Sequence, residues 1–442
     1  MNTYLTKKCL CLFLAIFGTL FATQDVSAQG ASSYEKSRGQ MMLDQVKSDI
    51  KSNYFDPNFQ GIDLENNFKE ASEKIKSAQS PGQIMGIIAQ AVLNLGDSHT
   101  FFIPPQRQAD TDYGVDFQVI GDDVYVVKVK DKSDASAKGI KVGDRVHLID
   151  GYQPARVNLW KLIYLYYALR PQPGFHIAVS SPGTEPRELD ILATVKDRKR
   201  IDLTNYVDFM DLVRESQNDE SKRKSSHRLH ELNDLVIWKM PAFNLTVDEV
   251  DGLMDKARSH KKLIIDLRGN GGGSEETLLR VIGNLFDREV KIGDIQRRKE
   301  LKPFIAKSRG DKAFTGQLIV LVDSISASSS EILARIVQLE KRGTIIGDRT
   351  AGAVMRARVY QHEVGVTSAA FYALSVTDAD VKMGDGKSLE RIGVTPDEIV
   401  LPTGADLAAK HDPVLSRAAS LLGVPIDAEK AGSLFQELKL KP

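Results

Sequence analysis

The sequence predicts a multidomain α/β protein (α+β in its domain arrangement) with a helical N-terminal region, a β-rich middle region and an α/β core. Residues 33–96 repeat apolar side chains at helical spacing, and residues 112–198 contain mostly short β-type runs. Residues 199–442 alternate strand and helix patterns, which is typical of a layered α/β structure. A chain of 442 residues is long enough for two or three such domains.

The composition is that of an ordinary globular protein, with 42% hydrophobic residues. The 59 basic side chains balance the 59 acidic ones. A formal charge of zero gives no reason to expect nucleic acid or an anionic surface as a partner. After the N-terminus, no apolar run is long enough to span a bilayer, so we expect no membrane span in the mature chain.

Residues 1–28 have the pattern of a secretory signal peptide. Two lysines precede an apolar run of about 13 residues, and small residues lead to Ala28, where we expect cleavage. A retained anchor or a lipoprotein is the less favoured alternative. Cys9 and Cys11 would leave with the signal, so the exported, periplasmic or extracellular protein would have no disulfide or cysteine nucleophile.

The region 29–111 contains three amphipathic segments that predict helices, at residues 32–55, 63–78 and 80–95. Asp63 is a candidate cap for the second helix, and Pro81 lies just inside the start of the third. Two consecutive prolines then end the regular structure.

The middle region predicts a hairpin over residues 113–130 that turns at 121–123. A short helix, a turn and a strand follow over 133–151, and a second hairpin is predicted over 175–194. In the core, the strand candidates are 235–240, 262–267, 318–323 and 343–348, and the helix candidates are 275–286 and 330–343. The charged stretch 217–228 is predicted to be a mobile surface loop.

Five serines crowd the stretch DSISASSSE, residues 323–331, where a buried strand runs into a helix. The first turn of a helix has unpaired, partially positive N–H groups, so a hydroxyl there lies beside donors for a developing oxyanion. Ser328 and Glu331 also fit the S-x-x-E capping box. From spacing alone the capping interpretation is favoured, and the serine that matters stays open.

Two further motifs carry chemistry. The stretch DLRGNGGGSEE, residues 266–276, places three glycines between a strand and a helix. A phosphate cradle is the alternative, but Ser274 and Glu275 replace the Lys and Ser/Thr that it needs, so an oxyanion loop fits better. His99 in GDSHT is a candidate base. His227 and His230 form an H-x-x-H pair without a carboxylate pattern, which gives little support for a metal site.

Five motifs in order, LGDSHT, IDLRGNGGG, DSISASSSEI, GDRTAG and LERIGVTPDEIV, resemble the tricorn and C-terminal-processing family of serine peptidases. The resemblance covers nearly the whole mature chain. It implies a PDZ-like domain over residues 112–198 and a Clp-protease/crotonase-like α/β peptidase core over residues 199–442.

By this resemblance Ser328 is the nucleophile. The backbone N–H of Ser329 and that of Gly273 or Gly272 would form the oxyanion hole. In the PDZ-like part, the backbone of Gly114, Val115, Asp116 and Phe117 would receive a peptide C-terminus.

One branch of the family uses a Ser–Lys dyad, but Ala353 stands here at the position of that lysine. The tricorn-like branch implies His99 as general base, with Ser98 and Glu390 orienting it, and Asp397 as structural. Activity should then fall as His99 becomes protonated at acid pH.

The expectation is therefore an exported serine endopeptidase that works through an acyl-enzyme and needs no cofactor or metal. Its substrate would be a protein or peptide. The alternatives are a non-catalytic ligand- or peptide-binding protein on the same fold and an adaptor led by the PDZ-like domain. The cleavage preference, the oligomeric state and the role of residues 217–228 stay open.

Overall fold

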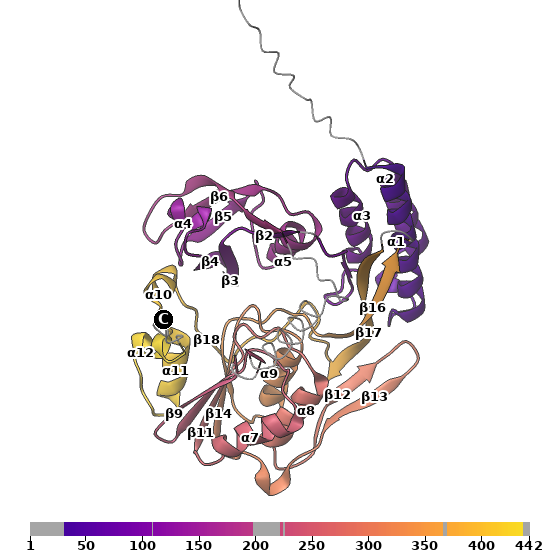
Figure 1. The fold of residues 1–442 in the computed structure, drawn as a ribbon. Helices are drawn as coiled ribbons and strands as arrows, with labels where there is room; N and C mark the ends of the chain where they lie inside the picture. The colour runs from indigo at the N-terminus through magenta and orange to yellow at the C-terminus, as the bar shows by residue number, and fades with distance from the viewer. Residues whose placement is uncertain (1–30, 108, 198–221, 224–225, 366–368, 436–442) are drawn as a thin grey trace, which may run out of the picture.

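The computed structural model describes residues 31–107, 109–197, 222–223, 226–365 and 369–435 (Figure 1). The expected signal sequence lies outside these ranges. Figure 1 shows three helices and a β-rich unit side by side at the top, with the α/β core below them. Among the helices in the described ranges, none has the length and apolar character needed to cross a membrane.

The N-terminal helices are α1 (Ser33–Asn53), α2 (Leu64–Lys76) and α3 (Pro81–Leu93), with a 3-10 turn at Phe59–Gly61. Each begins after a side chain that accepts a hydrogen bond from the first turn: Ser32, Asp63 and Ser80. The predicted cap at Asp63 and the position of Pro81 are thus confirmed. The buried helix faces share one apolar cluster with two distant strands, residues 355–364 and 370–383.

The middle region is one antiparallel sheet in the order β3-β4-β5-β6-β7, which confirms both predicted hairpins. Its elements are β3 (Val115–Ile120), β4 (Asp123–Val129), α4 (Asp134–Ala137), β5 (Arg145–Ile149), α5 (Leu159–Ile163), the π-helical η2 (Tyr164–Leu169), β6 (Gly174–Ser180) and β7 (Arg187–Leu192). The sequence did not predict α5 and η2. At the entry and exit of this unit, β2 (Ala109–Asp112) pairs with β8 (Thr194–Asp197).

The core sheet has the order β18-β15-β14-β11-β10-β9 and is parallel except for β9. Its strands are β9 (Arg228–Leu232), β10 (Leu235–Lys239), β11 (Lys262–Asp266), β14 (Gln317–Val322), β15 (Thr344–Gly347) and β18 (Glu398–Ile399). The four predicted core strands are confirmed as β10, β11, β14 and β15.

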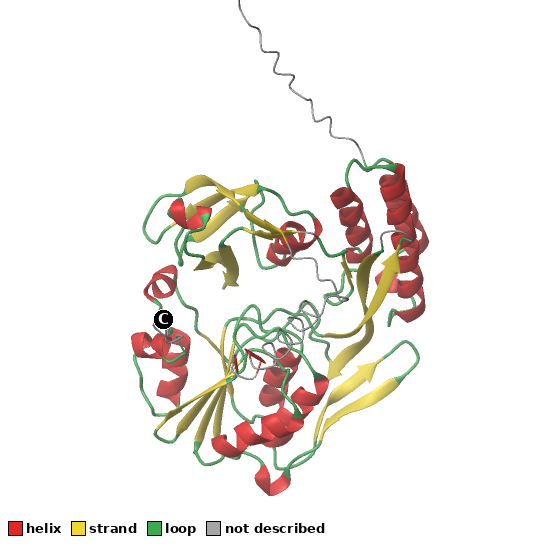
Figure 2. Cartoon of the chain, viewed as in Figure 1, coloured by secondary structure: helices red, strands yellow, loops and turns green. Residues whose placement is uncertain are grey.

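Helices cover both faces of the core sheet (Figure 2). One face packs on α7 (Val247–Ala257), α8 (Glu275–Leu285) and α9 (Ser329–Leu339), and the other on α11 (Pro413–Leu421) and α12 (Ala428–Ser433), while α10 (Gly404–Ala409) lies toward the β-rich unit. Alternate residues of one strand serve the two faces: Val236 and Trp238 join the first cluster, and Leu235 and Ile237 the second.

A second, antiparallel sheet was not predicted. It contains β1 (Phe101–Ile103), β12 (Val290–Gln296), β13 (Leu301–Ala306), β16 (Met355–Val364) and β17 (Ala370–Met383), with a 3-10 turn at Gly310–Lys312. Phe101 lies opposite Ser375 in the pairing of β1 with β17. This pairing carries the motif that contains His99 from the N-terminal region to the core.

The prediction of a surface loop at 217–228 is wrong for its last residues. His227 is buried, with Nε2 2.8 Å from Asn244 Oδ1, and Arg228 begins β9. His230 lies within β9, opposite Ile237. Polar side chains are tolerated here because β9 is the edge strand of the sheet. No cluster of three or more His, Cys, Asp or Glu side chains suited to a metal ion occurs within the described ranges.

Candidate active site

Ser328 lies in the turn between β14 and α9, in a backbone conformation that is rare for residues other than glycine. Its φ is 54° and its ψ is −116°, and such strain is kept where the surroundings fix it. Ser328 N–H donates to the carbonyl oxygen of Ala353 at 2.8 Å and to Glu331 Oε2 at 3.1 Å. Glu331 thus supplies the carboxylate of the predicted capping box, so support of this turn does not rest on the Ser328 hydroxyl.

The glycine loop approaches Ser328 closely. A Cβ added at Gly272 would lie 2.7 Å from Ser328 Cβ, and one at Gly273 would lie 2.4 Å from the carbonyl oxygen of Phe243. Both glycines have positive φ, 100° and 140°. The N–H of Gly272 already donates to Asn270 Oδ1 at 2.8 Å. Of the two predicted oxyanion donors, Gly273 is therefore the better placed.

Ser329, the other predicted oxyanion donor, is the first residue of α9. The N–H groups of a first helical turn have no partner within the helix, so this one can face a ligand. Ser329 Oγ donates to the carbonyl oxygen of Gly273 at 3.2 Å. The two predicted donors, Ser329 and Gly273, are thus in contact although 56 positions separate them in the sequence.

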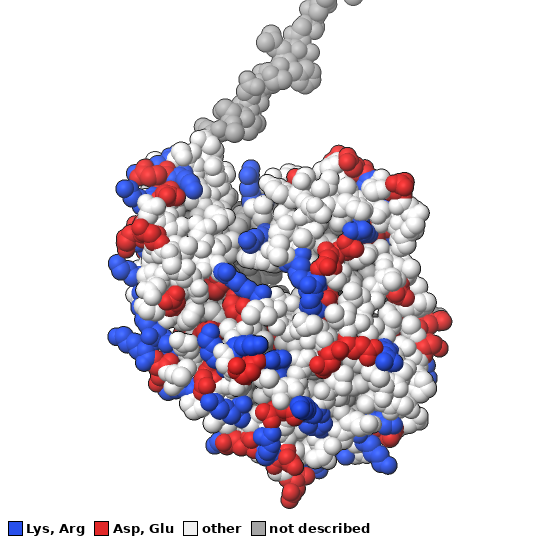
Figure 3. Space-filling view, turned by 180° about the vertical axis from the view of Figure 1, so that it is seen from behind, with Lys and Arg blue, Asp and Glu red and all other residues white. Residues whose placement is uncertain are grey.

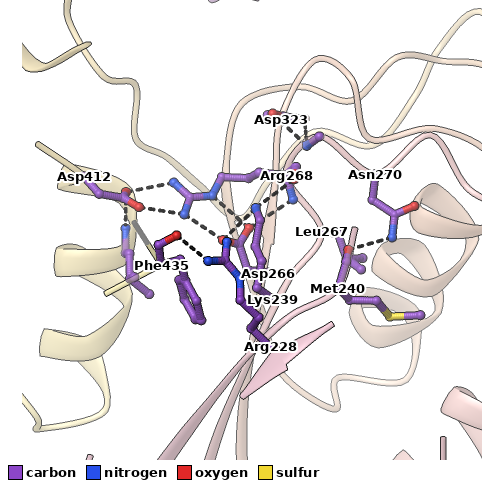
Figure 4. Close-up of polar contacts among 12 residues, drawn as sticks. Arg228, Lys239, Met240, Asp266, Leu267, Arg268, Asn270, Asp323, Asp412 and Phe435 are labelled. Carbon is purple, nitrogen blue, oxygen red and sulfur yellow. Dashed lines mark hydrogen bonds and ion pairs between the residues drawn. The ribbon is translucent and has the colours of Figure 1, made fainter. Parts of the chain in front are cut away.

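Part-buried ion pairs hold the start of the glycine loop (Figure 4). Arg268 bridges Asp266, at the end of β11, and Asp412, at the start of α11, with contacts of 2.7 to 2.9 Å. Burial alone would raise the pKa of Asp266, but Arg268 and Lys239 outweigh it and keep that pKa well below its ordinary value. Gly269 N–H donates to both oxygens of Asp323 at 3.0 Å, which ties the glycine loop to the serine turn.

The three predicted residues of the histidine relay contact one another. Ser98 Oγ lies 2.7 Å from His99 Nδ1 and donates to Glu390 Oε2 at 2.8 Å. Ser98 N–H donates to the second oxygen of Glu390, also at 2.8 Å. Burial lowers the pKa of His99 and raises that of Glu390. A lowered pKa keeps the imidazole neutral, as a general base requires.

Asp97 was not predicted as a site residue, yet it fixes this motif. It is buried and accepts the backbone N–H of His99 at 2.9 Å and that of Thr100 at 2.7 Å. It also accepts the hydroxyls of Thr377, from β17, at 2.7 Å and of Tyr54, from the end of α1, at 2.8 Å. The sequence holds one signal for it. Asp favours Asx turns, in which its carboxylate accepts the backbone N–H of the residue two positions later, here His99.

A single peptide unit, Ala353–Val354, connects the serine turn with the histidine relay. The carbonyl oxygen of Ala353 accepts Ser328 N–H, and the N–H of Val354 donates to Glu390 Oε2 at 3.0 Å. A path of hydrogen bonds and this one peptide group therefore runs from Ser328 through Glu390 and Ser98 to His99. Asp397, expected to be structural, accepts the N–H of Ile345 in the core sheet at 2.8 Å.

The predicted peptide-binding loop, Gly114 to Phe117, begins the edge strand β3. Gly114 N–H donates to Asp112 Oδ1 at 2.8 Å, so it is engaged within the chain. Further along the same strand, Gln118 Nε2 donates to Asp323 Oδ2 at 2.8 Å, and Ser324 Oγ donates to the carbonyl oxygen of Val119. The β-rich unit thus rests on the serine turn of the core.

The surface charge is mixed. Figure 3 shows acidic and basic side chains interspersed over the face that Figure 1 turns away from the viewer. No large patch of a single sign is visible on that face, which agrees with the balanced composition.

A strained serine, a histidine relay and glycine-loop N–H groups on an α/β core are the parts of a serine hydrolase. Residues 234–400 match the model of peptidase family S41. Over this part of its length the chain is therefore similar to the serine-type peptidases of family S41.

Known proteins of similar sequence point to the same family. A carboxyl-terminal-processing protease of Synechocystis sp. is 28% identical over 39% of this chain and 39% of its own length. The carboxy-terminal processing protease CtpA of Bacillus subtilis is 22% identical over 86% of this chain and 72% of its own length.

The fold is also shared with a solved structure. Mature CPAF complexed with lactacystin aligns with 85% of this chain and 96% of its own, with a TM-score of 0.64 and 15% identity. The chain spans 39%, 58% and 26% of the lengths of three carboxyl-terminal-processing and tail-specific proteases that it matches. The solved structure shows the fold, and the sequence matches show similarity to family S41.

Proposed function

We propose that this chain is an exported serine endopeptidase, with Ser328 as nucleophile, His99 as general base, and Ser98 and Glu390 orienting that base. The observation that carries the proposal is the relay in which Ser98 Oγ contacts both Glu390, at 2.8 Å, and His99, at 2.7 Å. Such a relay has a catalytic use that a packing role does not require, because it selects one tautomer of the imidazole.

The tautomer follows from the count of protons. When Glu390 is ionised it can only accept, so Ser98 Oγ donates its single proton to that carboxylate. Ser98 Oγ must then accept the proton on His99 Nδ1, which leaves the lone pair on Nε2. Nε2 is the atom proposed to take the Ser328 proton as the hydroxyl attacks a peptide carbonyl.

The remaining steps follow from the loops around Ser328. The tetrahedral oxyanion would rest on the N–H groups of Ser329 and Gly273, and losing one such donor typically costs about 100- to 1000-fold in rate. His99 then returns its proton to the leaving amine, and an acyl-enzyme forms on Ser328. Water, deprotonated by the same imidazole, releases the acyl group. Each step uses protein groups and water.

We further propose that the β-rich unit is PDZ-like and adds a peptide to the edge of β3. Gly114 is engaged by Asp112, so Val115 to Phe117 are the candidates for contact with a peptide C-terminus. Several relatives are named for the processing of carboxyl termini, which supports a protein or peptide as the substrate. Export rests on the pattern of residues 1–28.

Covalent labelling with a fluorophosphonate probe tests the proposal. We expect the wild type to label at one site and Ser328→Ala not to label. Ser420→Ala, which removes a hydroxyl on the exposed side of α11, is the matched control and should label normally. If the folded wild type stays unlabelled, the chain is a ligand-binding protein on a peptidase fold. Peptide binding that survives in Ser328→Ala would, in that case, identify an adaptor.

A further inference from the structure

The loop formed by residues 350–354 touches both halves of the proposed site, although none of its side chains has a proposed catalytic role. Ala351 N–H donates to the carbonyl oxygen of Ser326 at 3.0 Å, and the Ala353 carbonyl oxygen accepts Ser328 N–H at 2.8 Å. Val354 N–H donates to Glu390 at 3.0 Å. A shift of this loop would therefore move the nucleophile relative to the relay.

One buried carboxylate holds this loop in place. Glu331, in the first turn of α9, has no solvent exposure. Its Oε1 accepts the hydroxyl of Thr350 at 2.5 Å and the N–H of Gly352 at 2.8 Å. Its Oε2 accepts the N–H of Ala353 at 2.9 Å and that of Ser328 at 3.1 Å. A carboxylate offers about four lone-pair positions, so these four donors use its full capacity.

We propose that Glu331 is a positioning residue for catalysis, which holds the 350–354 loop and through it sets Ser328 against Glu390. This inference rests on the proposed peptidase function. A helix cap needs only one backbone contact, and Glu331 makes that contact to Ser328. The other three contacts lie in the loop, 19 to 22 residues along the chain. Their common effect is to fix the loop.

The environment of Glu331 adds a pH dependence. Burial raises its pKa to about 7, and its four hydrogen-bond partners, which lower that pKa, are all uncharged. The loop also contacts the carboxylate of Glu390, which accepts the N–H of Val354 and contacts the relay to His99. When Glu331 gains a proton, one of its oxygens becomes a donor that faces donors. The loop contacts should therefore weaken as the pH falls through about 7, while His99, whose pKa is lowered, is still neutral.

The test uses Glu331→Gln, which keeps the size of the side chain. The amide oxygen can replace one carboxylate oxygen, but the amide NH₂ must face two donors. We expect fluorophosphonate labelling at pH 8 to slow by about 10- to 100-fold, as expected for a displaced reacting group. Hydrogen exchange of the peptide containing residues 350–354 should become faster. Thr350→Val, which removes one donor, should cause the same changes to a smaller extent.

Glu340→Gln is the matched control, because Glu340 is at the other end of the same helix and pairs with Arg288 at the surface. It should label and exchange like the wild type. The pH dependence of the labelling rate separates positioning from a purely structural role, because a structural role would not change it. The wild-type labelling rate should fall as the pH drops through about 7, and Glu331→Gln should lose this step and retain only the lower one set by His99.

Two results would overturn the inference, and they differ from a failure of the proposed function. In the first, the wild type is labelled, and Glu331→Gln has the same labelling rate and the same hydrogen-exchange rate. Glu331 then has no positioning role, and the peptidase proposal stands. If the wild type does not label while Glu331→Gln exchanges faster, the loop contact exists but serves no catalysis. Slower labelling together with faster exchange and loss of the step near pH 7 would support the inference.

Discussion

The substitution Glu390→Gln tests the relay most directly, because it changes charge and hydrogen bonding while it keeps the shape. Glu390 accepts three donors: Ser98 N–H and Ser98 Oγ at 2.8 Å, and Val354 N–H at 3.0 Å. An amide has one oxygen for these sites. In either orientation its NH₂ group faces a backbone N–H, and in one of them it also faces the hydroxyl of Ser98.

Both orientations harm the base. If the NH₂ group faces Ser98 Oγ, that hydroxyl accepts from the amide and must donate to His99 Nδ1. The proton of the imidazole then moves to Nε2, the atom proposed to receive the Ser328 proton. If the amide oxygen faces Ser98 Oγ, the tautomer of His99 is kept. The negative charge that stabilises the imidazolium is then lost, and the amide NH₂ group faces the backbone N–H of Ser98. Loss of the corresponding acid in a Ser-His-Asp triad lowers kcat by about 10⁴.

A loss of about 10⁴ corresponds to about 5 kcal/mol in the activation free energy. The assay is the second-order rate of fluorophosphonate labelling, followed by hydrolysis of a peptide found in a library digest. Glu398→Gln is the control, since its carboxylate pairs with Arg417 outside the site. Thermal unfolding shows whether each variant is folded. A folded Glu390→Gln protein that labels within threefold of the wild type would refute the relay.

Two further predictions concern the glycine loop. Gly272→Ala places a Cβ 2.7 Å from Ser328 Cβ at a φ of 100°, so labelling should fall by about 100-fold or more. Gly269→Ala also has positive φ but meets no atom within 4 Å, and equal labelling of the two variants would contradict the steric argument. Asp412→Asn weakens the part-buried, bidentate pair with Arg268 and should cost about 1–3 kcal/mol in the free energy of unfolding. Urea unfolding measures this, and a change below about 0.5 kcal/mol would mean that the pair does not anchor the loop.

Much of the core could be predicted because its signals are local. The strands β11 and β14 are short apolar runs that lead into glycine- or serine-rich turns. This pattern is typical of buried parallel strands. The helices α8 and α9 follow those turns with acidic residues in their first turns. Local pattern and position along the chain were sufficient here, because the strands of this sheet lie side by side in the order in which they occur along the chain.

The second sheet escaped prediction because its pairings are distant and its pattern is weak. Only the two end residues of β16 are buried, and Arg356, Arg358 and His362 are among its side chains. Its burial depends on the N-terminal helices, which lie some 300 residues earlier in the sequence. The edge strand β9 was missed for a similar reason, because a polar strand can only be recognised from the sheet to which it adds.

The sequence by itself determined the inventory of the site: a serine at a helix start, a glycine loop after a strand, and a histidine beside a serine. These depend on short-range rules of helix ends and glycine conformation, which act within a few residues. Only the tertiary structure decided their association. The β1–β17 pairing brings Ser98 to Glu390 across 292 positions, and the 350–354 loop joins that relay to Ser328. Asp97 and Glu331 acquire their roles in the same way, because a buried carboxylate is defined by the donors that the fold brings to it.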